Sequence, residues 1–320
     1  MILKERKIPL KLQALESLLR RIPVNHRQRE AIENDLIKRK AGYKGEKNLD
    51  YYLSFYDHDG IYILNDIVLQ GIRSPFQIDS LVISLKFVLL IETKYFSGTL
   101  TFDQTFKQMI RSYENYEEAF FNPVLQAQRQ FVQFKEWLEE KNILYPPLEY
   151  IVVMSNPQTI LKAEEDELSK KIIRVDYLYN YLEKLNQKYT RETYTQEMAK
   201  HLVSVLLSEQ KREWLSVLSQ YQIDMSEIIR GVQCVSCNFT PMQRKLKKWF
   251  CPKCNSFSRT AHQQAIKDYF LLIKPTITNS ECRDFLKLDS RYVANGILTS
   301  MNFPSNGVTR GKKYYMPDWY

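Results

Sequence analysis

The sequence predicts a mixed α/β fold, with a mixed sheet flanked by helices, plus helical segments and a small cysteine-bearing module. Two observations support this prediction. Between residues 41 and 175, short apolar runs rich in Val, Ile and Leu alternate with segments whose apolar residues recur at helical spacing. Between residues 231 and 258, four of the five cysteines fall into two C-x-x-C pairs. At 320 residues, the chain is long enough for two or three domains.

The first 40 residues have a helical pattern. Leucines recur at helical spacing between Leu10 and Leu19, Pro23 interrupts the pattern, and a second helical segment runs from about His26 to Lys40. We expect a helical extension that packs on the core that follows. Its basic face could contact nucleic acid, although the pattern favours a structural role.

Residues 41–175 contain the runs that predict the sheet. A helical pattern follows Ala41, and another follows Pro123. The polar and aromatic stretch Gln104–Phe120 resembles an insertion, and no feature can be aligned to it. The expected strands, all assigned to one sheet, are Ile61–Leu69, Leu81–Ser84, Phe87–Ile91, Thr99–Phe102, Tyr150–Met154 and Ile172–Val175.

Three charged residues flank the apolar runs Leu81–Ser84 and Phe87–Ile91. Asp79 precedes the first run, and Glu92 and Lys94 end the second. If the runs form a β-hairpin, Glu92 and Lys94 share one face of their strand, because side chains alternate with a period of two. Paired carboxylates can bind a hard divalent cation, and a neighbouring lysine can orient water or neutralise phosphate. An exposed Glu-x-Lys pair at a strand end is, however, also common without any such function.

Four motifs in order strengthen the functional interpretation. They are G-x-x-G-E ending at Glu46, Q-I-D ending at Asp79, I-E-x-K ending at Lys94, and N-P-x-x-Q ending at Gln126. Together, over about residues 38–155, they resemble the nuclease-related domain (NERD) of the PD-(D/E)xK restriction-endonuclease-like superfamily. The resemblance implies a restriction-endonuclease-like fold and a metal-dependent nuclease acting on DNA, with Mg²⁺ or Mn²⁺ on Asp79 and Glu92. The implied catalytic residues are Glu46, Asp79, Glu92, Lys94 and Gln126. The alternative is a non-catalytic DNA-binding or regulatory protein that keeps the fold as a scaffold.

The two C-x-x-C pairs are separated by 13 residues, a spacing close to that of four-cysteine zinc sites. Cys234, Cys237, Cys251 and Cys254 are therefore the expected ligands of a structural Zn²⁺, in a unit that resembles a zinc ribbon. We expect Phe250 in its core and Cys282 as a buried residue outside the site. The expected nucleic-acid-binding residues of its loop are Arg244, Lys245, Lys247 and Lys248.

Residues 176–230 have a helical pattern, and residues 259–320 contain three short helical patterns followed by a basic turn and a strand. The last part resembles a helix-turn-helix with a wing. Caps are expected near Asn279-Ser280 and near Asp289-Ser290. Residues expected to face nucleic acid are Arg291, Tyr292 and Asn295 on the second helix and Arg310, Lys312 and Lys313 on the wing. A small domain that packs on the ribbon or binds a protein is the alternative. The expected regions are 1–40, 41–175, 176–230, 231–258 and 259–320.

The composition narrows the class of protein. The net charge is +9, and basic residues outnumber acidic ones in residues 1–40 and 241–320 but not between them. This distribution favours a nucleic-acid partner, DNA in our interpretation, although a solvated basic surface would have the same composition. The apolar runs are too short for a membrane span, and no secretion signal is recognisable, so we expect a soluble cytoplasmic protein without a membrane partner. The four histidines are scattered, which argues against a Ser-His or Cys-His hydrolase.

Overall fold

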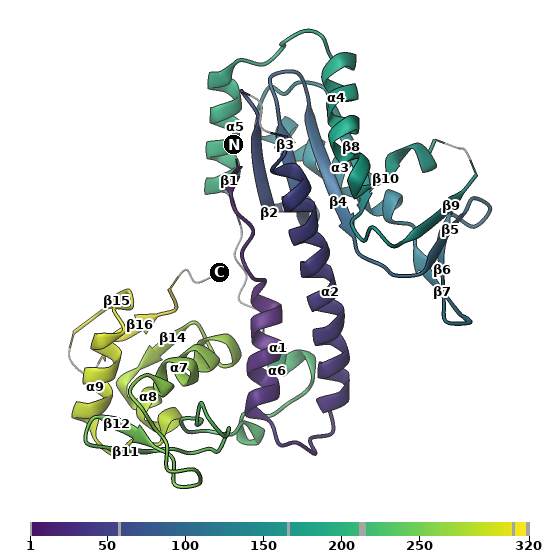
Figure 1. The fold of residues 1–320 in the computed structure, drawn as a ribbon. Helices are drawn as coiled ribbons and strands as arrows, with labels where there is room; N and C mark the ends of the chain where they lie inside the picture. The colour runs from purple at the N-terminus through teal and green to yellow at the C-terminus, as the bar shows by residue number, and fades with distance from the viewer. Residues whose placement is uncertain (1, 57–58, 165–166, 211–215, 309–310, 318–320) are drawn as a thin grey trace. The chain divides into compact units, whose positions relative to one another are not determined.

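The computed structural model describes residues 2–56, 59–164, 167–210, 216–308 and 311–317 (Figure 1). The chain divides into two compact units. Unit 1 comprises Met1–Lys7 and Ala41–Arg212, and unit 2 comprises Ile8–Lys40 and Glu213–Tyr320. Residues 1–40, expected to form one helical extension on the sheet domain, are therefore divided. The first seven belong to unit 1 because strand β1 (Ile2–Lys4) pairs with the edge of its sheet, whereas helix α1 (Leu10–Arg21) belongs to unit 2.

Unit 1 contains a six-stranded mixed sheet in the order β1-β2-β3-β4-β8-β10. Strands β2, β3 and β4 form an antiparallel meander, and β8 and β10 add to it in parallel. The predicted hairpin is therefore present, and the short strand near residue 172 joins the same sheet, as expected. The bounds are Tyr62–Gln70 for β2, Pro75–Ile83 for β3, Val88–Lys94 for β4, Leu148–Met154 for β8 and Ile172–Arg174 for β10.

A second sheet in unit 1 has four strands in the order β7-β6-β5-β9. The segment near residue 100, which we assigned to the main sheet, belongs here instead. The insertion-like stretch 104–120, to which no feature had been aligned, supplies most of the β6–β7 hairpin, whose turn has left-handed backbone at Glu114 and Asn115. The bounds are Thr99–Asp103 for β5, Gln108–Tyr113 for β6, Tyr116–Phe121 for β7 and Ile160–Ala163 for β9.

Helices cover both faces of the main sheet (Figure 1). Alternate residues of β3 enter different core clusters: Leu81 packs with α3 (Pro123–Glu140) and α5 (Gln196–Ser208), whereas Val82 packs with residues of α2 (Arg29–Leu53) and α4 (Leu178–Lys188). A sheet that is buried on both faces requires continuous apolar runs, because every side chain then faces a helix layer. The predicted mixed α/β class is confirmed.

Glu149 on β8 predicts a specific dependence of stability on pH. Burial alone would raise its pKa, but hydrogen bonds from Lys188 (2.7 Å), Lys171 (2.9 Å) and the Tyr189 hydroxyl (2.7 Å) lower it to about 2. A carboxylate with a lowered folded-state pKa stabilises the protein above the ordinary value of 4.5, and this stabilisation is lost as pH falls toward 2. We expect Glu149→Gln to cost about 2 kcal/mol at pH 7, after allowance for solvent screening, and about a quarter of that at pH 2.5. Urea unfolding at both pH values measures this; an equal loss at both would contradict it.

Unit 2 is built around one buried cluster that α1 shares with the cysteine-bearing sheet and the C-terminal helices. Arg21 of α1 is buried and donates to Asp268 (2.7 Å) and to the carbonyl of Gly231 (2.6 Å). The segments predicted as separate domains at 231–258 and 259–320 therefore lie in one compact unit. The short helix α6 (Val217–Gln220) also packs against α1.

The C-terminal part of unit 2 has the element order helix, strand, helix, helix and hairpin. Its three-stranded sheet has the order β14-β16-β15. Ser290 caps α9 as expected, but α8 is capped by Thr278 in a capping box with Glu281, one residue before the predicted cap. The bounds are Ala261–Leu272 for α7, Thr276–Thr278 for β14, Asn279–Leu286 for α8, Arg291–Ser300 for α9, Ser305–Asn306 for β15 and Lys313–Tyr315 for β16.

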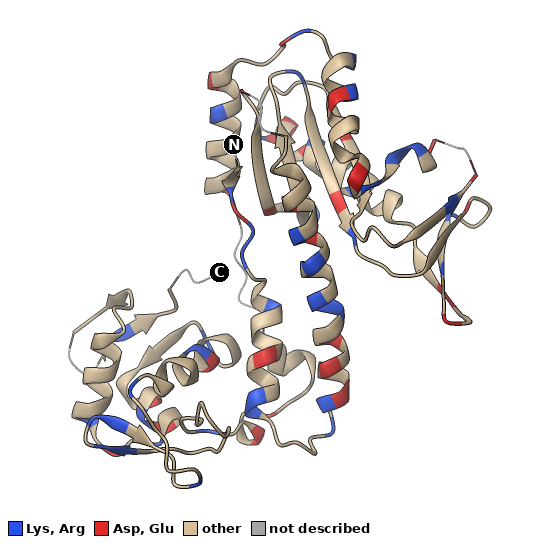
Figure 2. Cartoon of the chain, in the orientation of Figure 1, with Lys and Arg blue, Asp and Glu red and all other residues tan. Residues whose placement is uncertain are grey.

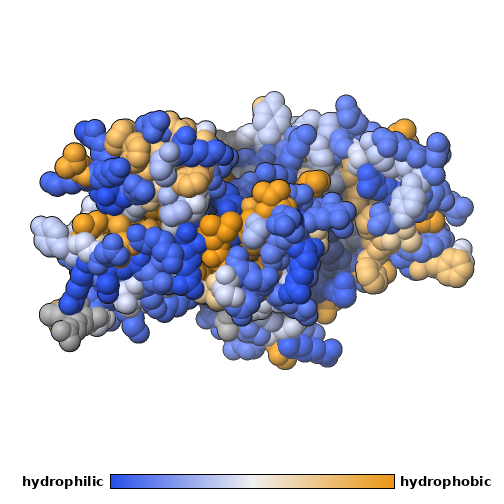
Figure 3. Space-filling view, turned by 90° about the horizontal axis from the view of Figure 1, so that it is seen from below, coloured by the Kyte–Doolittle hydropathy of each residue, from blue (hydrophilic) through white to orange (hydrophobic). Residues whose placement is uncertain are grey.

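Within the described residues, no helix combines the length and apolar character needed to cross a membrane. On the face drawn in Figure 3, hydrophobic residues gather in a few groups among hydrophilic ones.

Candidate functional site

The candidate site begins with the cross-strand pair Asp79 and Glu92. In the β3–β4 register, Ser80 lies opposite Ile91, so Asp79 and Glu92 occupy the next facing positions. Facing residues of an antiparallel pair project on the same side of a sheet. Asp79 accepts a hydrogen bond on Oδ2 from the backbone N–H of Thr93 (2.9 Å), and Glu92 Oε1 lies 2.7 Å from Lys94 Nζ. The sheet itself therefore brings Asp79, Glu92 and Lys94 together.

Helix α3 adds two glutamines to this group. Nε2 of Gln126 donates to Glu92 Oε1 (2.7 Å), and Nε2 of Gln130 donates to Glu92 Oε2 (2.8 Å). Gln126 also accepts from Lys94 Nζ (3.0 Å) through its Oε1. The N-P-x-x-Q motif has a local cause, because Asn122 caps α3 by accepting from the N–H of Val124, and proline is well suited to the first helical turn. Sequence reasoning missed Gln130, although its spacing of four from Gln126 places both on one helix face.

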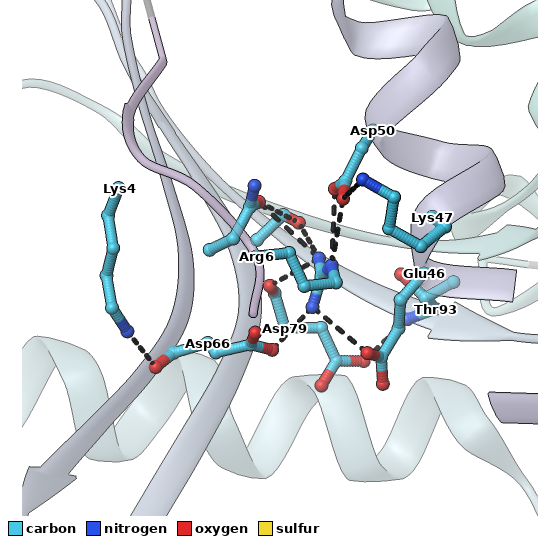
Figure 4. Close-up of polar contacts among 10 residues, drawn as sticks. Lys4, Arg6, Glu46, Lys47, Asp50, Asp66, Asp79 and Thr93 are labelled. Carbon is cyan, nitrogen blue, oxygen red and sulfur yellow. Dashed lines mark hydrogen bonds and ion pairs between the residues drawn. The ribbon is translucent and has the colours of Figure 1, made fainter. Parts of the chain in front are cut away.

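Glu46 reaches the site from α2 through Arg6, which sequence reasoning missed entirely. The Arg6 side chain is fully buried, and Figure 4 shows it at the centre of the acidic residues. It approaches Glu46 and Asp50 at 3.2 Å each and also pairs with Asp66. Its NH2 group donates to the Asp79 carbonyl (3.0 Å) and to Ser80 Oγ (2.8 Å). Arg6 thus ties β1 to α2, β2 and β3, and we define Arg6, Glu46, Asp50 and Asp66 as the Arg6 cluster.

Negative charge is in excess at this site. Burial, together with the nearby charge of Glu92, raises the pKa of Asp79 well above its ordinary value. Burial also raises the pKa of Glu46 to about 7, despite the opposing effect of Arg6. Buried carboxylates that lie close together are unfavourable as anions, because they lose hydration and repel one another. A bound cation would offset this cost.

The donor set fits a hard divalent cation. Asp79 and Glu92 offer carboxylate oxygens, which suit Mg²⁺ or Mn²⁺. Among the described residues, only the four cysteines form a group of three or more His, Cys, Asp or Glu ligands within 4.8 Å of one another. The acidic residues therefore form no closed cage. Mg²⁺ commonly uses one or two carboxylates and keeps several waters, so an open pair is an adequate site.

The two glycines of the G-x-x-G-E motif have different surroundings. A Cβ on Gly45 would lie 2.5 Å from Tyr95 Cβ and 2.6 Å from Ser155 Oγ, whereas a Cβ on Gly42 would meet nothing within 4 Å. Close packing therefore requires glycine only at residue 45. Gly45→Ala is expected to cost about 1–3 kcal/mol through overpacking and to displace α2, which carries Glu46.

Gly42→Ala is the matched control for this change. It should stabilise α2 by up to about 1 kcal/mol, because alanine is the better helix former. Urea unfolding of both variants checks the pair. Equal effects of the two substitutions would contradict the packing argument.

The four predicted cysteines lie together in unit 2. Their Sγ atoms are within 4.8 Å of one another, and the Cys234–Cys254 and Cys237–Cys251 distances are both 3.6 Å. Left-handed Asn238 and Asn255 follow the two pairs, in turns that return to the cysteine backbone. The small sheet next to them in the sequence consists of β11 (Gln243–Lys245), β12 (Lys248–Phe250) and β13 (Phe257–Ser258), and Cys251 directly follows β12. This cluster could hold a metal ion. Cys282 lies outside it, buried in α8 as expected.

The basic residues of unit 2 lie partly on aromatic rings. Arg244 stacks on Trp249 (5.1 Å) and Lys245 on Phe250 (4.3 Å), and Figure 2 shows the basic β11–β12 hairpin. The expectation that Phe250 is the core aromatic is wrong. Trp249 is fully buried and donates to His262 Nδ1 (3.1 Å), because this side of the short strand faces α7, whereas Phe250 is partly exposed. Lys247 and Lys248 are exposed.

The other residues expected to contact nucleic acid lie on α9 and the C-terminal hairpin. Arg291, Tyr292 and Asn295 are all exposed on α9. Lys313 is exposed, and Lys312 lies over the Tyr314 ring at 4.9 Å. Arg310 lies outside the described residues.

A family model matches part of the chain. The family model of the nuclease-related domain, NERD, matches residues 41–155. No curated protein and no solved structure matches the chain. The matched segment contains Glu46, Asp79, Glu92, Lys94 and Gln126, but not Arg6. The similarity to the nuclease-related domain thus covers residues 41–155 of the 320-residue chain.

Proposed function

We propose that this protein is a metal-dependent nuclease that cleaves phosphodiester bonds in DNA through a PD-(D/E)xK-type site in unit 1. The observation that carries the proposal is the arrangement of Asp79, Glu92 and Lys94 on facing strands, with Glu92 Oε1 2.7 Å from Lys94 Nζ. A structural ion pair between Glu92 and Lys94 would not require the second carboxylate, Asp79, whose pKa is raised by burial and by the charge of Glu92.

Each residue has a distinct role in this proposal. Asp79 and Glu92 would hold Mg²⁺ or Mn²⁺, which activates water and neutralises charge on the phosphate when bound. Gln126 and Gln130 fix the Glu92 carboxylate through one hydrogen bond to each oxygen. Lys94 places a positive charge where the attacking water and a phosphate oxygen would lie. Glu46, held by Arg6, orders water at the edge of the site.

Unit 2 would bind the nucleic acid. A structural Zn²⁺ on the four cysteines would fix the β11–β13 sheet, whose hairpin carries Arg244, Lys245, Lys247 and Lys248. The order α7-β14-α8-α9-β15-β16 is that of a helix-turn-helix with a wing, in which α9 would be the recognition helix. Phosphate contacts of this kind weaken steeply as salt concentration rises.

The test is cleavage of plasmid and linear DNA in Mg²⁺, in Mn²⁺ and in EDTA. We expect native protein to cut only with the divalent cation, and Asp79→Asn and Lys94→Ala to lose at least about a hundredfold in rate. Asp79→Asn should fold with equal or greater stability, because it removes a carboxyl group that is costly as an anion. Lys135→Ala, an exposed lysine on α3, is the control and should cut normally. Native protein that binds DNA but cuts under none of these conditions would favour a scaffold function instead.

A further inference from the structure

A pocket of about 480 Å³ in unit 1 has no role in the chemistry described so far. It is lined by α2 residues Lys44, Lys47 and Tyr51, by Tyr95 directly after β4, and by the segment 156–158 after β8. Its volume is in the range of pockets that bind small molecules and nucleotides. Its lining includes basic, aromatic and amide groups but no carboxylate.

The chain itself places this pocket beside the candidate site. Tyr95 directly follows Lys94, and Lys47 directly follows Glu46. On α2, Lys44, Lys47 and Tyr51 recur at spacings of three and four, so they form one stripe next to that of Glu46 and Asp50. A ligand in the pocket would therefore adjoin the carboxylates of the site.

The walls of the pocket are held together. Gly45 allows α2 to approach Tyr95 and Ser155 closely. Asn48 donates to the Ser155 carbonyl (2.5 Å), and Asn156 donates to the Phe96 carbonyl (2.7 Å). The helix and the two strand ends thus form a fixed frame, which a specific subsite requires.

The exposed groups suit one chemical class of ligand. Lys44 and Lys47 are exposed, and Lys47 Nζ lies 3.9 Å from Asp50, beyond a normal hydrogen bond. Lys44 Nζ lies 5.4 Å from the Tyr95 ring centroid, and Tyr51 is 59% exposed. Ammonium groups bind phosphate, and exposed aromatic rings stack on bases. We propose that this pocket is a nucleotide subsite for a single-stranded segment of the substrate next to the scissile phosphate. Lys44 and Lys47 would bind the phosphate, and Tyr51 and Tyr95 would stack on the base. The proposal rests on the nuclease function proposed above.

The test is photo-cross-linking of the full chain to a single-stranded oligonucleotide that carries 5-iodouracil, in Ca²⁺. We expect cross-linked peptides to contain Tyr51 or Tyr95, and Lys44→Ala/Lys47→Ala to lower their yield about tenfold. Tyr116→Leu, which removes an exposed tyrosine on β7, should leave the yield unchanged. Cross-links confined to other regions, unit 2 included, would overturn the proposal.

Cleavage kinetics show whether the nucleotide subsite or the proposed nuclease function is wrong. Tyr95→Leu keeps the Cβ atom that packs on Gly45, so the frame should persist. It should raise KM for a short oligonucleotide about tenfold with kcat little changed, because stacking contributes to binding rather than to chemistry. Unchanged KM in a protein that cuts DNA would reject the subsite alone. A protein that cross-links at the pocket but never cuts would retain the subsite and reject the nuclease.

Discussion

Arg6→Met is expected to destabilise unit 1 by about 3 kcal/mol at pH 7, because it leaves three carboxylates of the Arg6 cluster without their shared buried cation. It should also slow metal-dependent cleavage, since Glu46 and the Asp79 carbonyl lose the group that positions them. Methionine preserves most of the apolar stem, so the loss reports the charge and its hydrogen bonds. Urea unfolding and the plasmid assay measure the two effects.

The pH dependence of this effect follows from the same contacts. Removing the guanidinium raises the carboxylate pKa values further, so the variant should recover stability relative to native protein as pH falls from 7 toward 5. Lys7→Met, one residue away and exposed, is the control and should behave as native. If Arg6→Met had native stability and native cleavage, the cluster would have no positioning role.

Removing the metal ion proposed at the four cysteines is expected to have a second large effect, on the folding of unit 2. Binding of a structural zinc ion contributes on the order of 10 kcal/mol to the folding of small zinc modules. Cys234, Cys251 and Trp249 lie in the main core cluster of unit 2, so loss of the metal should unfold the β11–β13 sheet and loosen that core. We expect Cys251→Ala, or native protein with a strong chelator, to lose zinc and to expose Trp249.

Elemental analysis and tryptophan fluorescence check this prediction. Cys282→Ala is the matched control, because Cys282 is also buried but lies outside the cluster. It should retain one zinc per chain and lose stability only through the small cavity that it creates. Native protein that contains no zinc and keeps Trp249 buried would refute the structural metal.

Much of the main sheet could be predicted because its sequence signals are local. Runs such as 81–83 and 87–91 are apolar at every position, as strands buried on both faces must be. The C-x-x-C pairs and the Asp79, Glu92 and Lys94 group also follow from short-range patterns, since a hairpin aligns residues that are near one another in sequence.

The missed features depend on contacts that local patterns cannot encode. Arg6 meets Glu46 across 40 residues and Ser80 across 74, and β1 is too short to stand out in a helical region. Asp66 has left-handed backbone (φ 55°) within β2, which strand periodicity does not predict. Trp249, and not the expected Phe250, faces the core. Their strand has only three residues, and so short an alternation does not show which side chain is buried.

The proposed function depends on Asp79 and Glu92 binding a divalent cation together. Calorimetric titration with Mn²⁺ of native protein and of Asp79→Asn, both with their zinc content verified, measures this binding. We expect saturable binding at one site in unit 1 of the native protein, and loss of that site in Asp79→Asn without loss of folding. Equal Mn²⁺ binding by the two proteins, or none by either, would contradict it.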